Sequence, residues 1–210
     1  MRVTVAVRRV AKPGQEATLV AAMVAALGPS YASHRQQASI FQSDLEPARG
    51  LYVADYDSRA AYESRANPVV REIDGLCVQV DRCFYQRIHH FERVLEPGPV
   101  LTCAEFEVPP PAVDAVLAYL LHTSRPAIHA LPGCVLSILY RDLDAPGRLF
   151  ALQRWRSPDD RAAFEALAGP LGQPLRDWGV RIERFRGRAR AEVDAPLPNR
   201  GSKVGGSGPQ

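Results

Sequence analysis

A nearly identical pentapeptide occurs twice in this chain, as RAAYE at 59–63 and as RAAFE at 161–165. Two further blocks repeat in the same order, SIFQSDLEPARGLY (39–52) with SILYRDLDAPGRLF (137–150), and RIHHF (87–91) with RIERF (181–185). Chance rarely produces three matching blocks in one order. We therefore predict that the chain is an internal duplication of a smaller unit.

Hydrophobic patterning predicts the same elements in both copies. Val3, Val5 and Val7 alternate with other residues, which is typical of a strand. The first copy is predicted to contain, in order, a strand at 2–10, a helix at 15–27, strands at 37–44 and 50–56, a helix that begins after the N-cap Ser58, and a strand at 83–93. The second is predicted to contain a strand at 100–108, a helix at 111–123, strands at 135–143 and 148–156, a helix at 158–168, and a strand at 179–187.

Each copy therefore has the order βαββαβ, which forms a four-stranded antiparallel sheet with both helices on one face. The bare face of each sheet needs a cover, and the other copy can supply it. We predict an α+β fold in which two tandem ferredoxin-like units pack sheet to sheet, with pockets where the sheets curve away from each other or from their helices. The units are expected at 1–95 and 99–190, and the Gly-, Pro- and Ser-rich residues 191–210 are expected to be a disordered tail.

Composition narrows the classes of function. The 26 basic residues barely exceed the 23 acidic ones and are spread along the chain, which argues against a nucleic-acid partner. The most apolar run (17–28) is too short for a membrane span, and the charged N-terminus does not resemble a secretory signal, so we expect a cytoplasmic protein without a membrane partner. The four cysteines lack the spacing of a metal site and are expected to be buried, reduced thiols.

Two stretches resemble a known family. LFALQRWRSPDDRAAFEALAGP in the second copy and LYVADYDSRAAYESRANP in the first are similar to the hairpin, aromatic residue, serine and helix of the antibiotic biosynthesis monooxygenase family. IHALPGCVLSILYRDLD (128–144) fits that family's Pro-Gly turn before its second strand. Family members are usually single units that form a dimeric α+β barrel, so the resemblance implies that here the dimer is fused within one chain.

The resemblance also implies an activity. It is the oxidation by O2 of a phenolic or anthrone-like aromatic polyketide in secondary metabolism, without metal or flavin. Such a site must deprotonate the substrate, hold its anion away from water and admit O2. A polyketide cyclase and a non-catalytic protein that binds a small molecule or haem stay open as alternatives. So do a reduced flavin supplied by a partner reductase and a homodimer of the fused unit.

The family's pattern points to particular residues. Its members have a Trp that ends the third strand and a Tyr six positions later. Tyr56 and Tyr62 occupy these positions in the first copy, whereas the second has Trp155 and, on its helix, Phe164. The predicted catalytic residues are Tyr62, His34, His129 and Arg87. The predicted substrate-binding residues are Tyr52, Tyr56, Asn67, Trp155 and Arg181.

Several of these residues also have a structural interpretation. Tyr62 and Trp155 would equally serve as core aromatics, and Asn67 precedes a proline that can end a helix. His34 and His129 are expected in loops between the first helix and the second strand of their copies, where a neutral imidazole could accept a substrate proton. Arg87 and Arg181, the matched arginines of the last strands, would stabilise an oxyanion if they point inward and would be solvated if they point outward.

Overall fold

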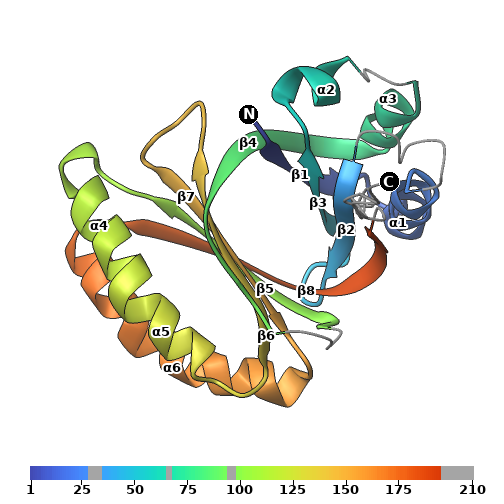
Figure 1. The fold of residues 1–210 in the computed structure, drawn as a ribbon. Helices are drawn as coiled ribbons and strands as arrows, with labels where there is room; N and C mark the ends of the chain where they lie inside the picture. The colour runs from blue at the N-terminus through green and yellow to red at the C-terminus, as the bar shows by residue number, and fades with distance from the viewer. Residues whose placement is uncertain (28–34, 65–67, 94–97, 195–210) are drawn as a thin grey trace, which may run out of the picture.

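The strands and helices follow the predicted order in the computed structural model, which describes residues 1–27, 35–64, 68–93 and 98–194 (Figure 1). The first half contains β1 (Val3–Ala11), α1 (Glu16–Ala25), β2 (Arg35–Ser43), β3 (Arg49–Tyr56), α2 (Arg59–Glu63), α3 (Pro68–Gly75) and β4 (Cys77–Glu92). The second contains β5 (Val100–Glu107), the 3₁₀ turn η2 (Pro110–Ala112), α4 (Val113–Tyr119), the π-helical segment η3 (Leu120–Ser124), α5 (Arg125–His129), β6 (Cys134–Asp142), β7 (Arg148–Trp155), α6 (Pro158–Asp177) and β8 (Arg181–Asp194).

The described strands close into a barrel in the order β1-β3-β2-β8-β5-β7-β6-β4. Each half contributes a four-stranded antiparallel sheet of the same topology, β4-β1-β3-β2 and β8-β5-β7-β6. The two long strands form the seams, because β4 also pairs with β6 and β8 also pairs with β2. The α+β ferredoxin-like class is therefore confirmed. Descent of the halves from one ancestral unit, and the unit boundaries, stay predictions.

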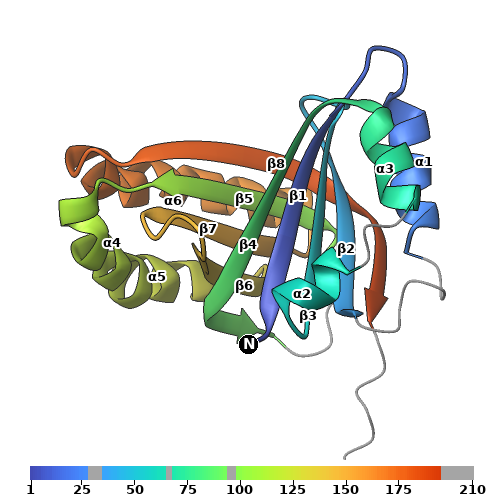
Figure 2. The same cartoon turned by 90° about the horizontal axis from the view of Figure 1, so that it is seen from above.

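Helices cover the outer face of each sheet. Figures 1 and 2 show α1, α2 and α3 over the first sheet and α4, α5 and α6 over the second, with no helix between the sheets among the described residues. Alternation in β1 explains the layers: Val3, Val5 and Val7 belong to the core under α1–α3, whereas Ala6 belongs to the core inside the barrel.

Aromatic side chains fill much of the barrel interior. The rings of Tyr85 and Phe150 stack with centroids 5.3 Å apart, and Tyr140 lies 5.7 Å from Phe150. Leu101 and Cys103 of β5 complete this core. The space between the sheets is therefore largely packed, and the cavities lie at its ends or under the helices.

The sheet register corrects the predicted match between Arg87 and Arg181. Val10 and Glu107 are each the eighth residue of their strands, β1 and β5. Val10 lies opposite Gln79 of β4, and Glu107 lies opposite Arg181 of β8. Arg181 is thus the counterpart of Gln79, and the alignment of RIHHF with RIERF is wrong. The short similarity of these blocks does not reflect equivalent places in the two sheets.

The predicted alignment of residues 39–52 with residues 137–150 is also wrong by one residue in the first strand of the hairpin. Tyr52 and Ala151, each the fourth residue of its strand, lie opposite Ile40 and Leu139. The gapless sequence alignment instead places Ile40 over Ile138. Ile40 packs under the helices of its sheet, whereas Ile138 faces the barrel interior. A shift of one residue exchanges the two faces of a strand, so the structural counterpart of Ile40 is Leu139.

Several predicted element ends are corrected. Helix α6 continues to Asp177 through Pro170 and Pro174, because burial of Ala168 and Leu175 against the sheet outweighs the lost backbone hydrogen bonds. Strand β4 begins six residues before the predicted position 83. Strand β8 extends to Asp194, so the first four residues of the predicted tail at 191–210 are paired with β2.

Other local predictions are confirmed. Ser58 caps α2, since its hydroxyl oxygen accepts a hydrogen bond of 3.1 Å from the backbone N–H of Ala61. The four cysteines are buried, free thiols. None of the described helices is both long enough and apolar enough to cross a membrane.

Candidate functional site

The structure brings together three of the predicted site residues on the outer face of the first sheet. The hydroxyl oxygens of Tyr52 and Tyr56 are 2.8 Å apart, and the rings of Tyr56 and Tyr62 meet edge to face with centroids 5.2 Å apart. Arg82 donates a hydrogen bond of 3.2 Å from its Nε to the Tyr62 hydroxyl. These tyrosines also pack against the core under α1–α3, so the same contacts serve both a structural role and an aromatic wall.

Arg87 lies away from these tyrosines, inside the barrel. It forms an ion pair with Asp55, which is only 8% exposed. The other oxygen of Asp55 accepts a hydrogen bond of 2.6 Å from the Thr4 hydroxyl. Arg87 therefore neutralises a buried carboxylate between β3 and β4, and this pairing accounts for its inward orientation.

Of three further predicted residues, the structure places one on the surface and does not describe the other two. Arg181 stands at the start of β8 with a side chain that is 79% exposed, and it pairs with Glu107 at 3.4 Å. It is a surface charge of the kind that the sequence left open. His34 and Asn67 lie outside the described residues.

Trp155 is fully buried at the end of β7, under the helices of the second sheet. Its ring stacks on Phe164 of α6 with centroids 4.9 Å apart and an interplanar angle of 22°. The indole Nε1 has no hydrogen-bond partner in the described part of the chain. Trp155 is thus a core aromatic that keeps one unused donor.

His129 lies in the last turn of α5, and the prediction that it sits in a loop is wrong. Its ring stacks on the rings of Phe91 and His89, with centroid distances of 4.1 Å and 5.2 Å. Its buried Nε2 has no hydrogen-bond partner among the described residues. Burial, assisted by the neighbouring His89 and Arg125, lowers the pKa of His129 to about 4. The imidazole is therefore neutral at pH 7.

Arg125, which the sequence did not single out, is the most unusual charged residue of this half. It begins α5, one helical turn before His129, and is only 1% exposed. It donates to the Ser137 hydroxyl from one terminal nitrogen. In the amide orientation that satisfies its partners, the Gln153 oxygen accepts from the same nitrogen at 3.1 Å while the Gln153 nitrogen donates to the Thr102 carbonyl at 3.0 Å.

The charge of Arg125 has no counterion among the described residues, since every hydrogen-bond partner it has is neutral. Its Nε is buried and unpartnered. Burial lowers the pKa of the guanidinium to about 10, so it still carries its charge at pH 7. A buried cation without a carboxylate is costly, and such a group calls for an explanation outside the chain's own contacts.

A cavity of about 50 Å³ is lined in part by Arg125 and lies between the second sheet and the helical segments η3, α5 and α6. Its polar lining comes from Ser124, Arg125, Gln153 and Arg184, and no carboxylate is among the described residues that line it. Phe164 belongs to its apolar wall. The cavity therefore presents positive charge and neutral donors to whatever enters it.

Further unsatisfied polar atoms gather on the same outer face. Besides Arg125 Nε, they are Thr102 Oγ1, His89 Nδ1, His129 Nε2 and Trp155 Nε1. Glu165 Oε1 of α6 also has no hydrogen bond, but it forms an ion pair with Arg186 at 3.0 Å. Buried polar side-chain atoms in folded proteins normally have a hydrogen-bond partner. A buried polar atom without one commonly marks the position of a ligand or a water molecule. The π-helical segment η3, a form that occurs frequently at functional sites, ends directly before Arg125.

Residues 99–168, which run from β5 into α6, match the family model described as antibiotic biosynthesis monooxygenase. The match covers most of the second half of the chain and none of the first. It contains Arg125, His129 and Trp155, so the unsatisfied polar atoms of α5 and β7 belong to the antibiotic biosynthesis monooxygenase segment. No curated protein matches the sequence.

Solved structures share the fold of the whole chain. An anthrone oxidase-like protein superimposes with a TM-score of 0.75 at 13% identity, over 93% of this chain and 94% of that one. A putative monooxygenase from Fusobacterium nucleatum subsp. nucleatum gives 0.73 at 8% identity, over 92% and 94% of the two chains. One from Lactobacillus acidophilus NCFM gives 0.67 at 7% identity, over 92% and 96%. At such identities the likeness establishes the antibiotic biosynthesis monooxygenase-like fold across both halves.

A periodic signal in the sequence could have revealed Arg125. Val116, Leu120 and Ile128 continue a helical spacing beyond the predicted end at 123, and all three are buried. Extending the helix along this spacing would have placed Arg125 and His129 one turn apart on one face. What the spacing could not show is that this face holds no carboxylate.

Acid is expected to destabilise the protein through His129. The pKa of this side chain is about 4 in the folded protein and about 6.5 in an unfolded chain. Between these values the unfolded chain binds a proton that the folded protein does not, so the free energy of unfolding falls as the pH drops from about 6.5 to about 4. Urea unfolding at about pH 7 and pH 5 should show a smaller loss for His129→Asn than for the wild type. Equal losses would contradict a depressed pKa.

Proposed function

We propose that the half of the chain that matches the antibiotic biosynthesis monooxygenase family oxidises a phenolic or anthrone-like aromatic compound with O2, in the cavity under η3, α5 and α6. The observation that carries this proposal is the buried Arg125, which lines the cavity and has no counterion within residues 1–27, 35–64, 68–93 and 98–194. A cation in that position favours the ionised form of an acidic hydroxyl or enol. The substrate anion would supply the negative charge that the chain omits.

The chemistry follows from that anion. Removing a proton from an anthrone-like CH2 gives an anion whose negative charge is shared between the oxygen, held by Arg125, and the carbon. The carbon transfers electrons to O2 and forms a C–O bond, giving a hydroperoxide once a proton is taken up. Loss of water then converts the original CH2 to C=O, so that one O2 is consumed for each ketone and water formed. Charge-assisted hydrogen bonds to the oxygen stabilise the anion and the transition state that leads from it.

Other residues around the cavity would support this reaction. Arg184 adds a second positive charge to the lining, and Phe164, backed by Trp155, offers an aromatic wall. His129 does not line the cavity itself, but it lies one helical turn after Arg125 on α5. It is the candidate proton acceptor, because its Nε2 is unpartnered among the described residues and its depressed pKa keeps it neutral. A base with so low a pKa is weak, so most of the driving force for deprotonation would come from the two arginines.

The cavity must enlarge to take such a substrate. About 50 Å³ is space for a few water molecules and not for a fused aromatic system. The segment η3–α5 forms the outer wall together with α6, and its π-helical turn departs from regular helical hydrogen bonding. We propose that this segment moves outward when substrate enters. The barrel closes within one chain, so the site does not require a second copy.

The proposal assigns no organic cofactor or metal, because the substrate anion itself provides the electrons for O2. Dithranol, an anthrone with two further phenolic hydroxyls, is a suitable probe. We expect the purified protein to consume one O2 per dithranol and to release a product with one more oxygen and two fewer hydrogens, with or without a chelator. A strict requirement for added reduced flavin would contradict the assignment of no cofactor.

Other results would indicate the alternative functions. A product formed without O2 consumption would point to a cyclase, and saturable binding of dithranol without turnover would point to a binding protein. Two substitutions test which half holds the site, because Tyr62 is the catalytic tyrosine predicted in the first half. If Tyr62→Phe abolished O2 uptake while substitution of Arg125 did not, the reaction would belong to the first half.

A further inference from the structure

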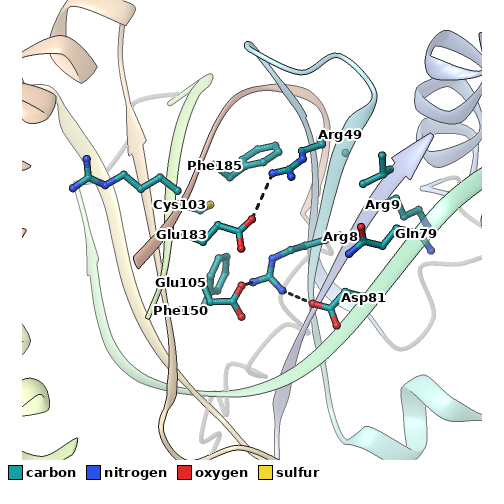
Figure 3. A pocket seen from close by; sticks show the side chains of 13 residues that line it. Arg8, Arg9, Arg49, Gln79, Asp81, Cys103, Glu105, Phe150, Glu183 and Phe185 are labelled. Carbon is teal, nitrogen blue, oxygen red and sulfur yellow. Dashed lines mark hydrogen bonds and ion pairs between the residues drawn. The ribbon is translucent and has the colours of Figure 1, made fainter. Parts of the chain in front are cut away.

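A second cavity, of about 130 Å³, opens between the two sheets at one end of the barrel (Figure 3). The proposed oxygenase site lies under the helices on the outer face of the second sheet, and Arg184 is the one described residue found in the linings of both cavities. Residues of β1, β3 and β4 line one wall, and residues of β5, β7 and β8 line the other. It is larger than the cavity beside Arg125, which measures about 50 Å³.

Opposite charges face each other across this cavity. Arg8 of the first sheet reaches Glu105 of the second at 2.7 Å, and Arg49 of the first reaches Glu183 of the second at 3.5 Å. Figure 3 shows these side chains converging on the space between the sheets. Asp81 also lies on the first wall, but it is held 3.0 Å from Arg8. Arg184 of β8 is also in the lining of the second wall. Across the cavity, the guanidinium groups of Arg8 and Arg49 therefore face the carboxylates of Glu105 and Glu183.

The two ion pairs differ in depth. Glu105 is 16% exposed, and burial raises the pKa of its carboxyl group above the ordinary value. Glu183 is 66% exposed and its contact with Arg49 is long, so this pair lies at the mouth. Exposed ion pairs contribute little to stability, which means that a ligand can separate Arg49 from Glu183 at small cost.

Apolar side chains supply the rest of the lining. Phe150 and Phe185 stand beside the charged groups, together with the buried Cys103. The Phe150 ring lies 5.4 Å from the guanidinium carbon of Arg8, which fixes the end of that side chain. A ligand that places its charged end at the mouth would meet an apolar surface farther in.

We propose that this cavity binds a small zwitterion, an α-amino acid with an apolar side chain. Its carboxylate lies against Arg49 and Arg8, its ammonium group against Glu183 and Glu105, and its side chain against Phe150 and Phe185. The walls are complementary to both charges at once, whereas a ligand with a single charge leaves one wall unmatched.

Isothermal titration calorimetry of the full chain tests the proposal with three probes of one shape. L-phenylalanine carries both charges, 2-phenylethylamine only the ammonium, and 3-phenylpropionate only the carboxylate. We expect L-phenylalanine to bind, and each analogue to bind at least tenfold more weakly. Equal affinity of either analogue, or no heat of binding with L-phenylalanine up to the millimolar range, would overturn the proposal.

Matched variants locate the binding. Glu183→Gln and Arg49→Gln should each weaken L-phenylalanine binding at least tenfold, and both residues are exposed enough for the fold to tolerate the change. Arg181→Gln, two residues earlier on β8, removes a surface charge that does not line the cavity and should leave binding unchanged. Binding that survives both cavity variants would contradict this site. None of these measurements depends on oxygen uptake, so the outcome is independent of the proposed oxygenase activity.

Discussion

Replacing Arg125 by methionine is expected to reduce oxygen uptake by about 100-fold or more while leaving the protein at least as stable as the wild type. The two effects differ because they have different origins. Activity depends on the positive charge that faces the cavity, whereas stability suffers from burying that charge without a counterion. A residue that merely supported the fold would lose stability when replaced.

Physical estimates support both directions. Removal of one preorganised donor to a developing oxyanion typically costs about 100- to 1,000-fold in rate. Replacing a buried charge by an apolar side chain of similar volume is often neutral or stabilising, by up to about 4 kcal/mol. Here the gain is reduced because Ser137 and Gln153 each lose a hydrogen-bond partner. We therefore expect the net change in unfolding free energy to be close to zero or favourable.

Oxygen-electrode kinetics with dithranol and urea unfolding measure these two effects on the same preparations. Arg176→Met is the matched control, because Arg176 lies on α6 with an exposed side chain bonded to Gln173 and to the Gly169 carbonyl. It should change neither quantity. Unaltered oxygen uptake in Arg125→Met would remove the proposed site from the second half, and a loss of several kcal/mol in stability would show that Arg125 is a structural residue.

Replacing Trp155 by alanine is expected to lower the free energy of unfolding by about 3–5 kcal/mol. Trp155 has no exposed surface, stacks on Phe164 and packs with Val100 and Cys134. Truncation would leave a large cavity at the point where β5, β6 and β7 meet α6. A loss of this size is a large part of the stability of a typical domain.

The chain offers a control of the same residue type. Trp178 follows α6, is 38% exposed and touches Tyr119 edge to face at 5.6 Å. Trp178→Ala should cost about 1 kcal/mol or less. Urea unfolding of both variants gives the comparison, and similar losses for the two would show that the burial of Trp155 does not determine its contribution.

The sequence predicted the order of elements because alternation and turn residues are local signals. Val3, Val5 and Val7 form β1 as expected, and the Ser58 cap starts α2. The register between the halves was not predictable in the same way. It depends on pairings such as Val10 with Gln79, which are set across the sheet and leave no mark in adjacent residues.

The candidate site was predictable only in part. The family resemblance led to Trp155 and the tyrosines, and an expected loop position led to His129. The structure brings Tyr52, Tyr56 and Tyr62 together. Arg125 was missed because an arginine is usually exposed, and only three-dimensional packing shows that this one is enclosed among neutral groups. Arg87 and Arg181 stand in similar short sequences but have different surroundings. Arg87 is paired with Asp55 inside the barrel, whereas Arg181 lies on the surface.

The strands that join the two sheets, β4 and β8, limit which parts of the molecule can open. Because β4 is bonded to β1 and β6, and β8 to β5 and β2, neither can release its neighbours without breaking both sheets at once. We therefore expect the local opening that lets a ligand enter to occur in the helical layers and at the open end of the barrel. The closed ring of eight strands is expected to be rigid. Backbone amides of the strands should exchange with solvent slowly, and those of the outer helices should exchange sooner.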